Sequence, residues 1–167
     1  MAIFSHHKKW NIKTIVVLAS IFILSILIEI VGVATGKPFG VYEYGKGLGV
    51  KIADVPIVIG LNWVFLVYAS NGIIAKYTSK NSLIILGAAL LMILYDILLE
   101  KVAPLMHMWQ FSKNDPPINN YVSWFLLALC FNWAIQYFKV NTRNRPARWL
   151  FFIQLIFFAI IVVYNTF

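Results

Sequence analysis

Three carboxylic acids lie within long apolar stretches of this 167-residue chain. Glu29 falls near the end of one stretch, and Asp96 and Glu100 fall near the end of another. A charged side chain at the centre of a bilayer costs roughly 2.5–3.5 kcal/mol on insertion scales, so an acid at such a position is a candidate for a functional site. The chemistry open to these side chains is proton donation and proton acceptance inside a membrane.

The spacing of the acids sharpens this prediction. Asp96 and Glu100 are four residues apart, which places them on one face of a helix, about one turn from each other. Glu29 lies roughly 10 Å from the end of its own stretch at a helical rise of 1.5 Å per residue. Carboxylates that are close together in a low dielectric cannot all ionise cheaply, so we expect at least one to hold its proton near neutral pH. A neutral carboxyl group of this kind can act as a general acid.

Each acid also has a purely structural interpretation. Glu29 and Asp96 could make buried, hydrogen-bonded or ion-paired contacts between helices. Glu100 is followed by Lys101 and Pro104, so it could be a charge at the level of the lipid headgroups.

The composition identifies the class of protein. Hydrophobic residues make up 61% of the chain and charged residues only 12%, against about 25% charged in soluble domains. We therefore expect one integral membrane domain spanning residues 1–167. The net charge of +8 arises from basic residues at the ends of the apolar stretches, which favours contact with anionic lipid headgroups over nucleic acid.

Five apolar stretches are long enough to cross about 30 Å of hydrocarbon, which takes roughly 20 helical residues. They cover Thr14–Ala34, Pro56–Ala75, Ser82–Val102, Tyr121–Phe138 and Arg148–Tyr164. Backbone groups in lipid must be satisfied internally, and strands of alternating polarity are absent, so the sequence predicts an all-α, polytopic transmembrane bundle. The first stretch is too long for the apolar core of a signal peptide and carries Glu29, which favours a retained helix.

The distribution of Lys and Arg predicts the orientation. The amino terminus, the 76–80 turn and the 139–148 loop hold nine of these residues, against five in the two other loops. The positive-inside rule therefore places the amino terminus in the cytoplasm and the carboxyl terminus outside. All six acidic residues then gather on the outward side, and one polar site near the outer leaflet explains this. The six are Glu29, Glu43, Asp54, Asp96, Glu100 and Asp115.

The two outward loops combine glycines and prolines with aromatic residues. Residues 36–45 read Gly-Lys-Pro-Phe-Gly-Val-Tyr-Glu-Tyr-Gly, and residues 103–124 contain Trp109, Trp124 and a Pro-Pro pair. Glycine supplies positive φ and proline fixes φ, so we expect a defined, tightly turned backbone. The interfacial belt is the alternative for each Trp and Tyr taken singly. Asp54 is most simply a cap of the helix predicted from Pro56.

Metal and nucleotide chemistry find no support in the motifs. His6 and His7 lie on the far side from the acids, which leaves only His107 near them, and no helical pair of histidines exists. A phosphate-cradling glycine loop, a dinucleotide fingerprint and a serine nucleophile elbow are also missing. We expect no metal and no cofactor.

Two blocks of residues carry a resemblance to a known family. The first is Glu29-x-x-Gly32, Gly36-Lys37-Pro38-Phe39-Gly40-x-Tyr42-x-Tyr44-x-x-x-Leu48-Gly49, Val55-Pro56 and Asn62-Trp63. The second is Asp96-x-x-x-Glu100-x-x-Ala103, Trp109, Pro117-x-Asn119-Asn120-Tyr121 and Trp124. In order and spacing they resemble the membrane carotenoid biosynthesis proteins of the carotenoid 1,2-hydratase (bisanhydrobacterioruberin hydratase) type. The resemblance covers roughly Leu27 to Trp133.

The resemblance implies addition of water across the terminal C1=C2 double bond of an acyclic carotenoid, giving a tertiary alcohol without a metal or redox cofactor. For that reaction we expect the Asp96/Glu100 pair to supply the proton, and Glu29 or Asp54 to position or deprotonate the water. Aromatic faces would steady the carbocation by about 0.5–2 kcal/mol each. The expected substrate-binding residues are Tyr42, Tyr44, Asn62, Trp63, Trp109, Asn120 and Trp124.

The expected partners are the acyclic carotenoid substrate, membrane lipid and other carotenoid-pathway enzymes, with no nucleic acid, in a bacterial cytoplasmic membrane. Two other functions remain open. A proton-coupled transporter would need polar residues through the whole membrane depth, whereas the cytoplasmic halves of the stretches are almost wholly aliphatic and aromatic. A non-catalytic membrane subunit that holds other carotenoid enzymes is the second alternative.

Overall fold

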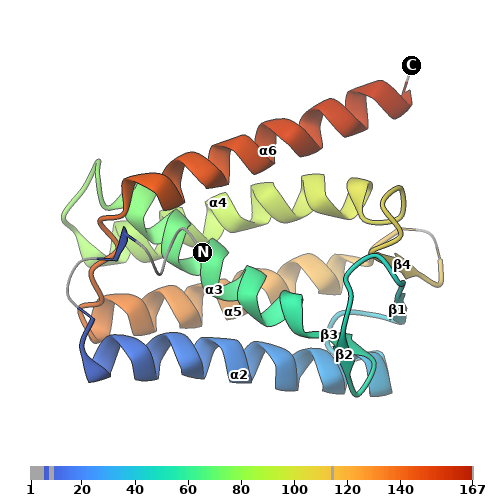
Figure 1. The fold of residues 1–167 in the computed structure, drawn as a ribbon, viewed down its shortest axis with the longest axis horizontal. Coiled ribbons are helices and arrows are strands. Elements are labelled where there is room, and N and C mark those ends of the chain that lie inside the picture. Colours follow the sequence, from blue (N-terminus) through green and yellow to red (C-terminus); the bar gives the residue numbers. More distant parts are fainter. Residues whose placement is uncertain (1–5, 8–9, 114, 167) are drawn as a thin grey trace.

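The computed structural model describes residues 6–7, 10–113 and 115–166, and in this part of the chain five long helices form one bundle (Figure 1). Each is long and apolar enough to cross a membrane. This confirms the predicted all-α transmembrane bundle, and the predicted helix ends differ from the observed ones by at most three residues. The helices are α2 (Ile12–Thr35), α3 (Ile57–Ile74), α4 (Asn81–Val102), α5 (Ile118–Tyr137) and α6 (Arg145–Thr166).

Helix α3 lies at the centre of the bundle, where it contacts α2, α4, α5 and α6 (Figure 1). Its membrane-spanning window is 72% buried, far more than that of any other helix. Polar and aromatic side chains on α3 therefore face other helices and not lipid. Helix α6 is the least buried, and its carboxyl-terminal half diverges from the rest of the bundle in Figure 1.

Successive helices run in opposite directions, so the loops alternate between the two ends of the bundle (Figure 1). Residues 36–56 and 103–117 lie at one end with the last turns of α2 and α4. We call this the acidic end, because all six acidic residues belong to it. The loops 75–80 and 138–144 lie at the other end, which we call the basic end. Lys8 and Lys9, two of the cations counted for the orientation, lie outside the described residues.

Four short strands at the acidic end were not predicted from the sequence. Strand β1 (Tyr42–Tyr44) pairs antiparallel with β4 (Trp109–Phe111), and β2 (Lys51–Ile52) pairs antiparallel with β3 (Val55–Pro56). The β1–β4 pair joins the two outward loops, which are far apart in sequence. The signal was present as an aromatic–polar–aromatic alternation in both segments, which is the period of a half-buried strand.

The entry into α3 corrects the predicted role of Asp54 as a helix cap. Ala53 and Asp54 both have positive φ, of 47° and 65°, as the central residues of the tight turn between β2 and β3. Such a turn suits strand twist, and aspartate tolerates this conformation. The Asp54 side chain is exposed there, and α3 begins after Pro56 without a side-chain cap.

A glycine at the basic end fixes the loop 138–144 against α3. A Cβ atom added to Gly72 would lie 2.4 Å from the carbonyl oxygen of Thr142, which is backbone and cannot swing away. A Cβ atom on Gly87 in α4 would meet only the side chain of Ile74, at 3.1 Å or more. Gly72 is therefore required for close packing, whereas Gly87 is not.

We predict that Gly72→Ala lowers the thermal unfolding midpoint of the detergent-solubilised protein. The cost of forced overpacking is about 1–3 kcal/mol, which exceeds the gain in helix propensity from alanine. Gly87→Ala is the matched control and should leave the midpoint unchanged or raise it. Equal midpoints for the two variants would show that the Thr142 contact does not constrain the fold.

Candidate active site

A small cavity of about 20 Å³ lies at the acidic end, enclosed by α2, α3, α4, α5 and the β1–β4 pair. This volume holds about one water molecule. Eight of the predicted site residues line it, namely Glu29, Tyr42, Tyr44, Asn62, Glu100, Trp109, Asn120 and Trp124. The tertiary structure thus brings residues from six separate elements to one cavity.

Glu29 reaches the cavity from α2 and is only 4% exposed. Its Oε2 accepts hydrogen bonds from the hydroxyl groups of Tyr42 at 2.5 Å and Tyr44 at 2.8 Å. Trp63 Nε1 on α3 donates to Oε1 at 3.5 Å. Three donors that converge on one carboxyl group stabilise its ionised form.

Gly32, one turn beyond Glu29, permits this arrangement. A Cβ atom at this position would lie 2.8 Å from both the Tyr42 hydroxyl oxygen and the Phe39 ring. The missing side chain lets the first outward loop fold back closely onto α2. Glu29 therefore accepts the hydrogen bond of Tyr42, and Gly32 leaves the space that the Tyr42 hydroxyl group occupies.

Glu100 enters the same cavity from α4 and is 7% exposed. Trp109 Nε1 donates to its Oε2 at 2.9 Å, and Asn120 Nδ2 donates to its Oε1 at 3.0 Å. Trp109 belongs to β4 and Asn120 to the first turn of α5. These buried contacts argue against the alternative that Glu100 is a charge among the lipid headgroups.

Asp96 lies one helical turn from Glu100 on the same face of α4, deeper in the bundle. It is fully buried, and neither carboxyl oxygen has a hydrogen-bond partner within the described part of the chain. It does not line the cavity. A charged carboxylate without donors is very costly to bury, whereas a neutral carboxyl group is much less so.

The β1–β4 pair covers the two glutamates with four aromatic rings. Residues 42 and 44 of β1 stand opposite residues 111 and 109 of β4, and all four side chains turn to the cavity. Glu43 and Gln110, at the position between them, are exposed. The alternation of a strand thus directs the aromatic rings inward and the polar residues outward.

A pair of stacked indoles lies beside the cavity. The rings of Trp63 on α3 and Trp124 on α5 stack at 4.1 Å between centroids and 25° between planes. Trp124 lines the cavity. Trp63 does not line it, but it donates a hydrogen bond to Glu29, which does.

Burial, and after it the negative charge of Glu29, raise the pKa of Tyr42 and Tyr44 above that of a free tyrosine. Both hydroxyl groups therefore remain protonated through the physiological range and act as donors to Glu29.

The structure separates Asp54 from the other predicted site residues, since the β2–β3 turn holds it exposed and away from the cavity lining. Conversely, Phe39, Ile59 and Phe111 line the cavity and were not predicted as site residues. The two phenylalanines lie in the aromatic loops, and the alternation of Phe111 with Trp109 could have identified it. Nothing in the sequence distinguishes Ile59 from other apolar residues of α3.

A second group of buried polar side chains lies toward the basic end, between α3, α5 and the 138–144 loop. Asn71 donates to Asn132 at 3.1 Å and accepts from Gln136 at 2.8 Å and from Thr142 at 3.3 Å. At this level the bundle therefore contains polar side chains, contrary to the expectation of cytoplasmic halves that are almost wholly aliphatic and aromatic. These amides satisfy one another and tie the loop to the bundle.

No group of three His, Cys, Asp or Glu side chains converges in a way that could hold a metal ion within residues 6–7, 10–113 and 115–166. The chemistry that the described site offers is acid–base chemistry by two facing carboxyl groups beside a water-sized cavity.

Fold and site together define an integral membrane helical bundle with buried carboxyl groups at one end. The chain belongs to the carotenoid biosynthesis protein family, which matches it over residues 1–167. This membership assigns the protein a role in carotenoid biosynthesis and agrees with the resemblance seen in the two sequence blocks. No curated protein and no solved structure matches the chain.

The raised pKa of Tyr42 and Tyr44 gives a test of the site geometry. Unperturbed tyrosines ionise at about pH 10, and groups with a raised pKa ionise only at higher pH. We predict that Tyr42→Phe/Tyr44→Phe shows the same rise in phenolate absorbance from about pH 9 to 11 as the wild type. Loss of two of the eight tyrosines from this rise would contradict the buried hydrogen bonds to Glu29.

Proposed function

We propose that the protein hydrates the terminal C1=C2 double bond of an acyclic carotenoid end group to a tertiary alcohol. The observation that carries the proposal is that Glu29 and Glu100 face one cavity with room for about one water molecule. An unactivated alkene needs a positioned proton donor, and the resulting cation needs a water molecule and a base. The cavity supplies a place for each of these.

The hydrogen bonds suggest how the proton is divided among the acids. Two ionised carboxylates on one small buried cavity repel each other strongly. Glu29 has three donors and Glu100 has two, so Glu29 keeps the negative charge and Glu100 the proton. Asp96, which has no donor within the described part of the chain, is a neutral acid one turn behind Glu100 and can relay the proton that Glu29 returns to Glu100.

The reaction balances with these groups alone. The π electrons of C1=C2 form a new bond between C2 and the proton of Glu100, which leaves a tertiary carbocation at C1 and a carboxylate at Glu100. The water oxygen bonds to C1, and Glu29 accepts the released proton. Proton return from Glu29 to Glu100 regenerates the site, and the net change is alkene plus water to alcohol.

The aromatic rings have a role in the charged step. Tyr42, Tyr44, Trp109 and Trp124 line the cavity, and a ring face near a desolvated cation contributes about 0.5–2 kcal/mol. The carotenoid end group is larger than one water molecule, so its entry requires displacement of the β1–β4 cover. Such closure over the substrate excludes bulk water, which would otherwise compete as a proton acceptor.

A groove between α2 and α5 offers a place for the hydrocarbon chain of the substrate. It has a volume of about 280 Å³ and is almost wholly apolar, with Val17, Ile21, Leu24, Phe131 and Ala134 among its lining residues. Phe131 packs edge-on against Trp63 at 5.6 Å, and Trp63 stacks on Trp124 at the cavity. These buried rings thus lie between the groove and the cavity, and a polyene in the groove reaches the acids with its end group only when they move apart.

The expected orientation completes the proposal. With the amino terminus in the cytoplasm the cavity lies near the outer leaflet of a bacterial cytoplasmic membrane, and the substrate enters laterally from the bilayer. Association with other carotenoid-pathway enzymes is compatible with the exposed faces of the outer helices.

The test of this function is product analysis in cells that make acyclic carotenoids of the lycopene type. The wild type should convert them to products heavier by one water. Glu100→Gln and Glu29→Gln should lower the rate of hydration by about 10²–10⁴-fold, which is the usual contribution of general acid–base catalysis. Asp96→Asn should also lower this rate. Glu43→Gln, an exposed acid of β1, is the matched control and should keep wild-type activity.

Two outcomes would overturn the proposal. Wild-type rates in folded Glu100→Gln and Glu29→Gln would remove the acid–base assignment. If the wild type yields no hydrated product from any acyclic carotenoid, the protein is a non-catalytic subunit of the pathway.

The groove has its own test. Ala134→Trp places a large ring in the groove, where the polyene would lie. Because the polyene and the ring would then overpack the same space, hydration of a full-length carotenoid should slow about tenfold or more. A short acyclic isoprenoid with the same end group should react as before. Leu126→Trp adds a similar ring on an exposed part of α5 outside the groove and serves as control. Equal loss with both substrates would show that the groove does not hold the chain.

A further inference from the structure

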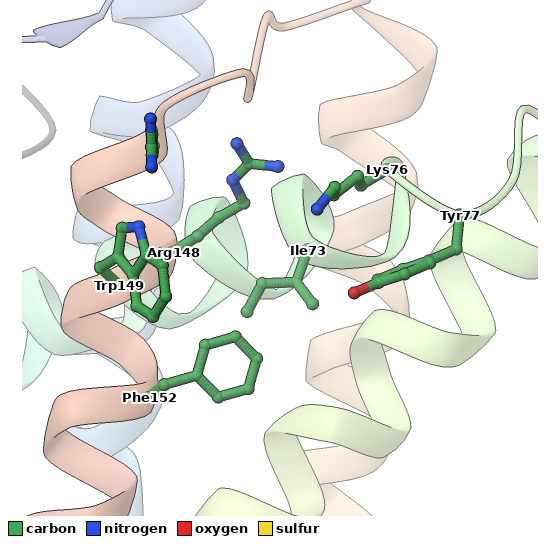
Figure 2. A pocket seen from close by; sticks show the side chains of 7 residues that line it. Ile73, Lys76, Tyr77, Arg148, Trp149 and Phe152 are labelled. Carbon is green, nitrogen blue, oxygen red and sulfur yellow. The ribbon is translucent and has the colours of Figure 1, made fainter.

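A pocket of about 300 Å³ at the basic end lies between the last turn of α3 and the first turns of α6, far from the candidate active site (Figure 2). Its volume is at the lower end of the range for ligand sites. It is lined by Ile73, Lys76, Tyr77, Arg145, Arg148, Trp149 and Phe152.

Three of the seven lining residues are cationic, and no acid accompanies them. In Figure 2 the guanidinium group of Arg148 and the amine of Lys76 point toward one another above Ile73. Within the described part of the chain, neither Arg145 nor Arg148 has a side-chain hydrogen bond or ion pair, and Lys76 only lies over the Tyr77 ring at 5.8 Å. Like charges that converge without a counter-charge repel each other unless an anion lies between them.

The remaining lining residues form an apolar side. Ile73 and Phe152 lie below the cationic groups in Figure 2, and the hydroxyl group of Tyr77 points into the same space. Trp149 and Phe152 are 58% and 39% exposed on the outer face of α6. Trp and Arg at the end of a spanning helix are typical of the level of the lipid headgroups. The pocket therefore offers cations at the top, apolar contacts below and an opening to the bilayer.

We propose that this pocket binds the phosphate group of an anionic phospholipid. Arg148 can hold two phosphate oxygens with its planar fork, and Lys76 and Arg145 add charge around the same group. The acyl chains of the lipid then continue along Phe152 on the outer face of α6. All six acidic residues lie at the opposite end of the bundle, so no carboxylate competes with the phosphate.

The experiment is native mass spectrometry of the full chain in detergent, titrated with phosphatidylglycerol, with phosphatidylcholine and with inorganic phosphate. We expect one phosphatidylglycerol to bind in preference to phosphatidylcholine. Lys76→Gln/Arg148→Gln should weaken phosphatidylglycerol binding about tenfold or more, because each cation near an anionic lipid contributes several-fold to affinity. Weak binding of inorganic phosphate is expected, since the apolar side then has no partner.

A matched control removes two other cations from the same end. Lys139→Gln/Arg143→Gln lowers the charge equally but lies outside the pocket, and its phosphatidylglycerol affinity should remain that of the wild type. Equal weakening in both double variants would show general attraction to anionic lipid and overturn a specific site. Equal affinities for phosphatidylglycerol and inorganic phosphate would show a free-phosphate site instead. Thermal unfolding of both variants without lipid verifies that they are folded.

Discussion

The structure depends on burying carboxyl groups where water cannot solvate them. A buried acid is tolerable only if donors meet its charge or if it keeps its proton. Glu29 has three donors and Glu100 has two, whereas Asp96 has none within the described part of the chain. Those donors come from four different elements, so the acids fix how the loops close over the bundle. In the proposed function, the same requirement leaves the negative charge on Glu29 and the protons on Glu100 and Asp96.

The pairing of the two outward loops brings hydrogen-bond donors to the buried glutamates. The β1–β4 ladder holds Tyr42 and Tyr44 for Glu29 and holds Trp109 for Glu100. A single strand pair thereby couples the surroundings of both glutamates. In the proposed reaction, displacement of this pair would open the cavity and remove donors from both acids together, which would link substrate entry to the protonation of the site.

The acidic and basic residues are segregated at opposite ends of the bundle. The acidic end places three of its six carboxyl groups, those of Glu29, Asp96 and Glu100, inside the protein. The basic end places Lys and Arg at the surface and around an open pocket, which we propose as the site of a lipid phosphate group. The buried amide network around Asn71 lies between the core and the basic loops and fixes the loop 138–144 in place. The proposed reaction and the proposed lipid site thus lie at opposite ends of the bundle.

The sequence by itself determined the five helices, since about 20 consecutive apolar residues in lipid have no other way to satisfy their backbone. It also identified Glu29, Asp96 and Glu100, because an acid within an apolar stretch can be recognised without knowledge of the tertiary structure. Only the tertiary structure decided which of them share a cavity: Glu100 and Glu29 do, Asp96 lies behind them, and Asp54 turns outward. Those outcomes depend on strand pairing and turn conformation, and contacts between residues 42–44 and 109–111 have no local signature that fixes their register. The buried amide network of the basic end was not predicted from the sequence, because the hydrogen-bond partners of single polar residues are decided by how the helices pack.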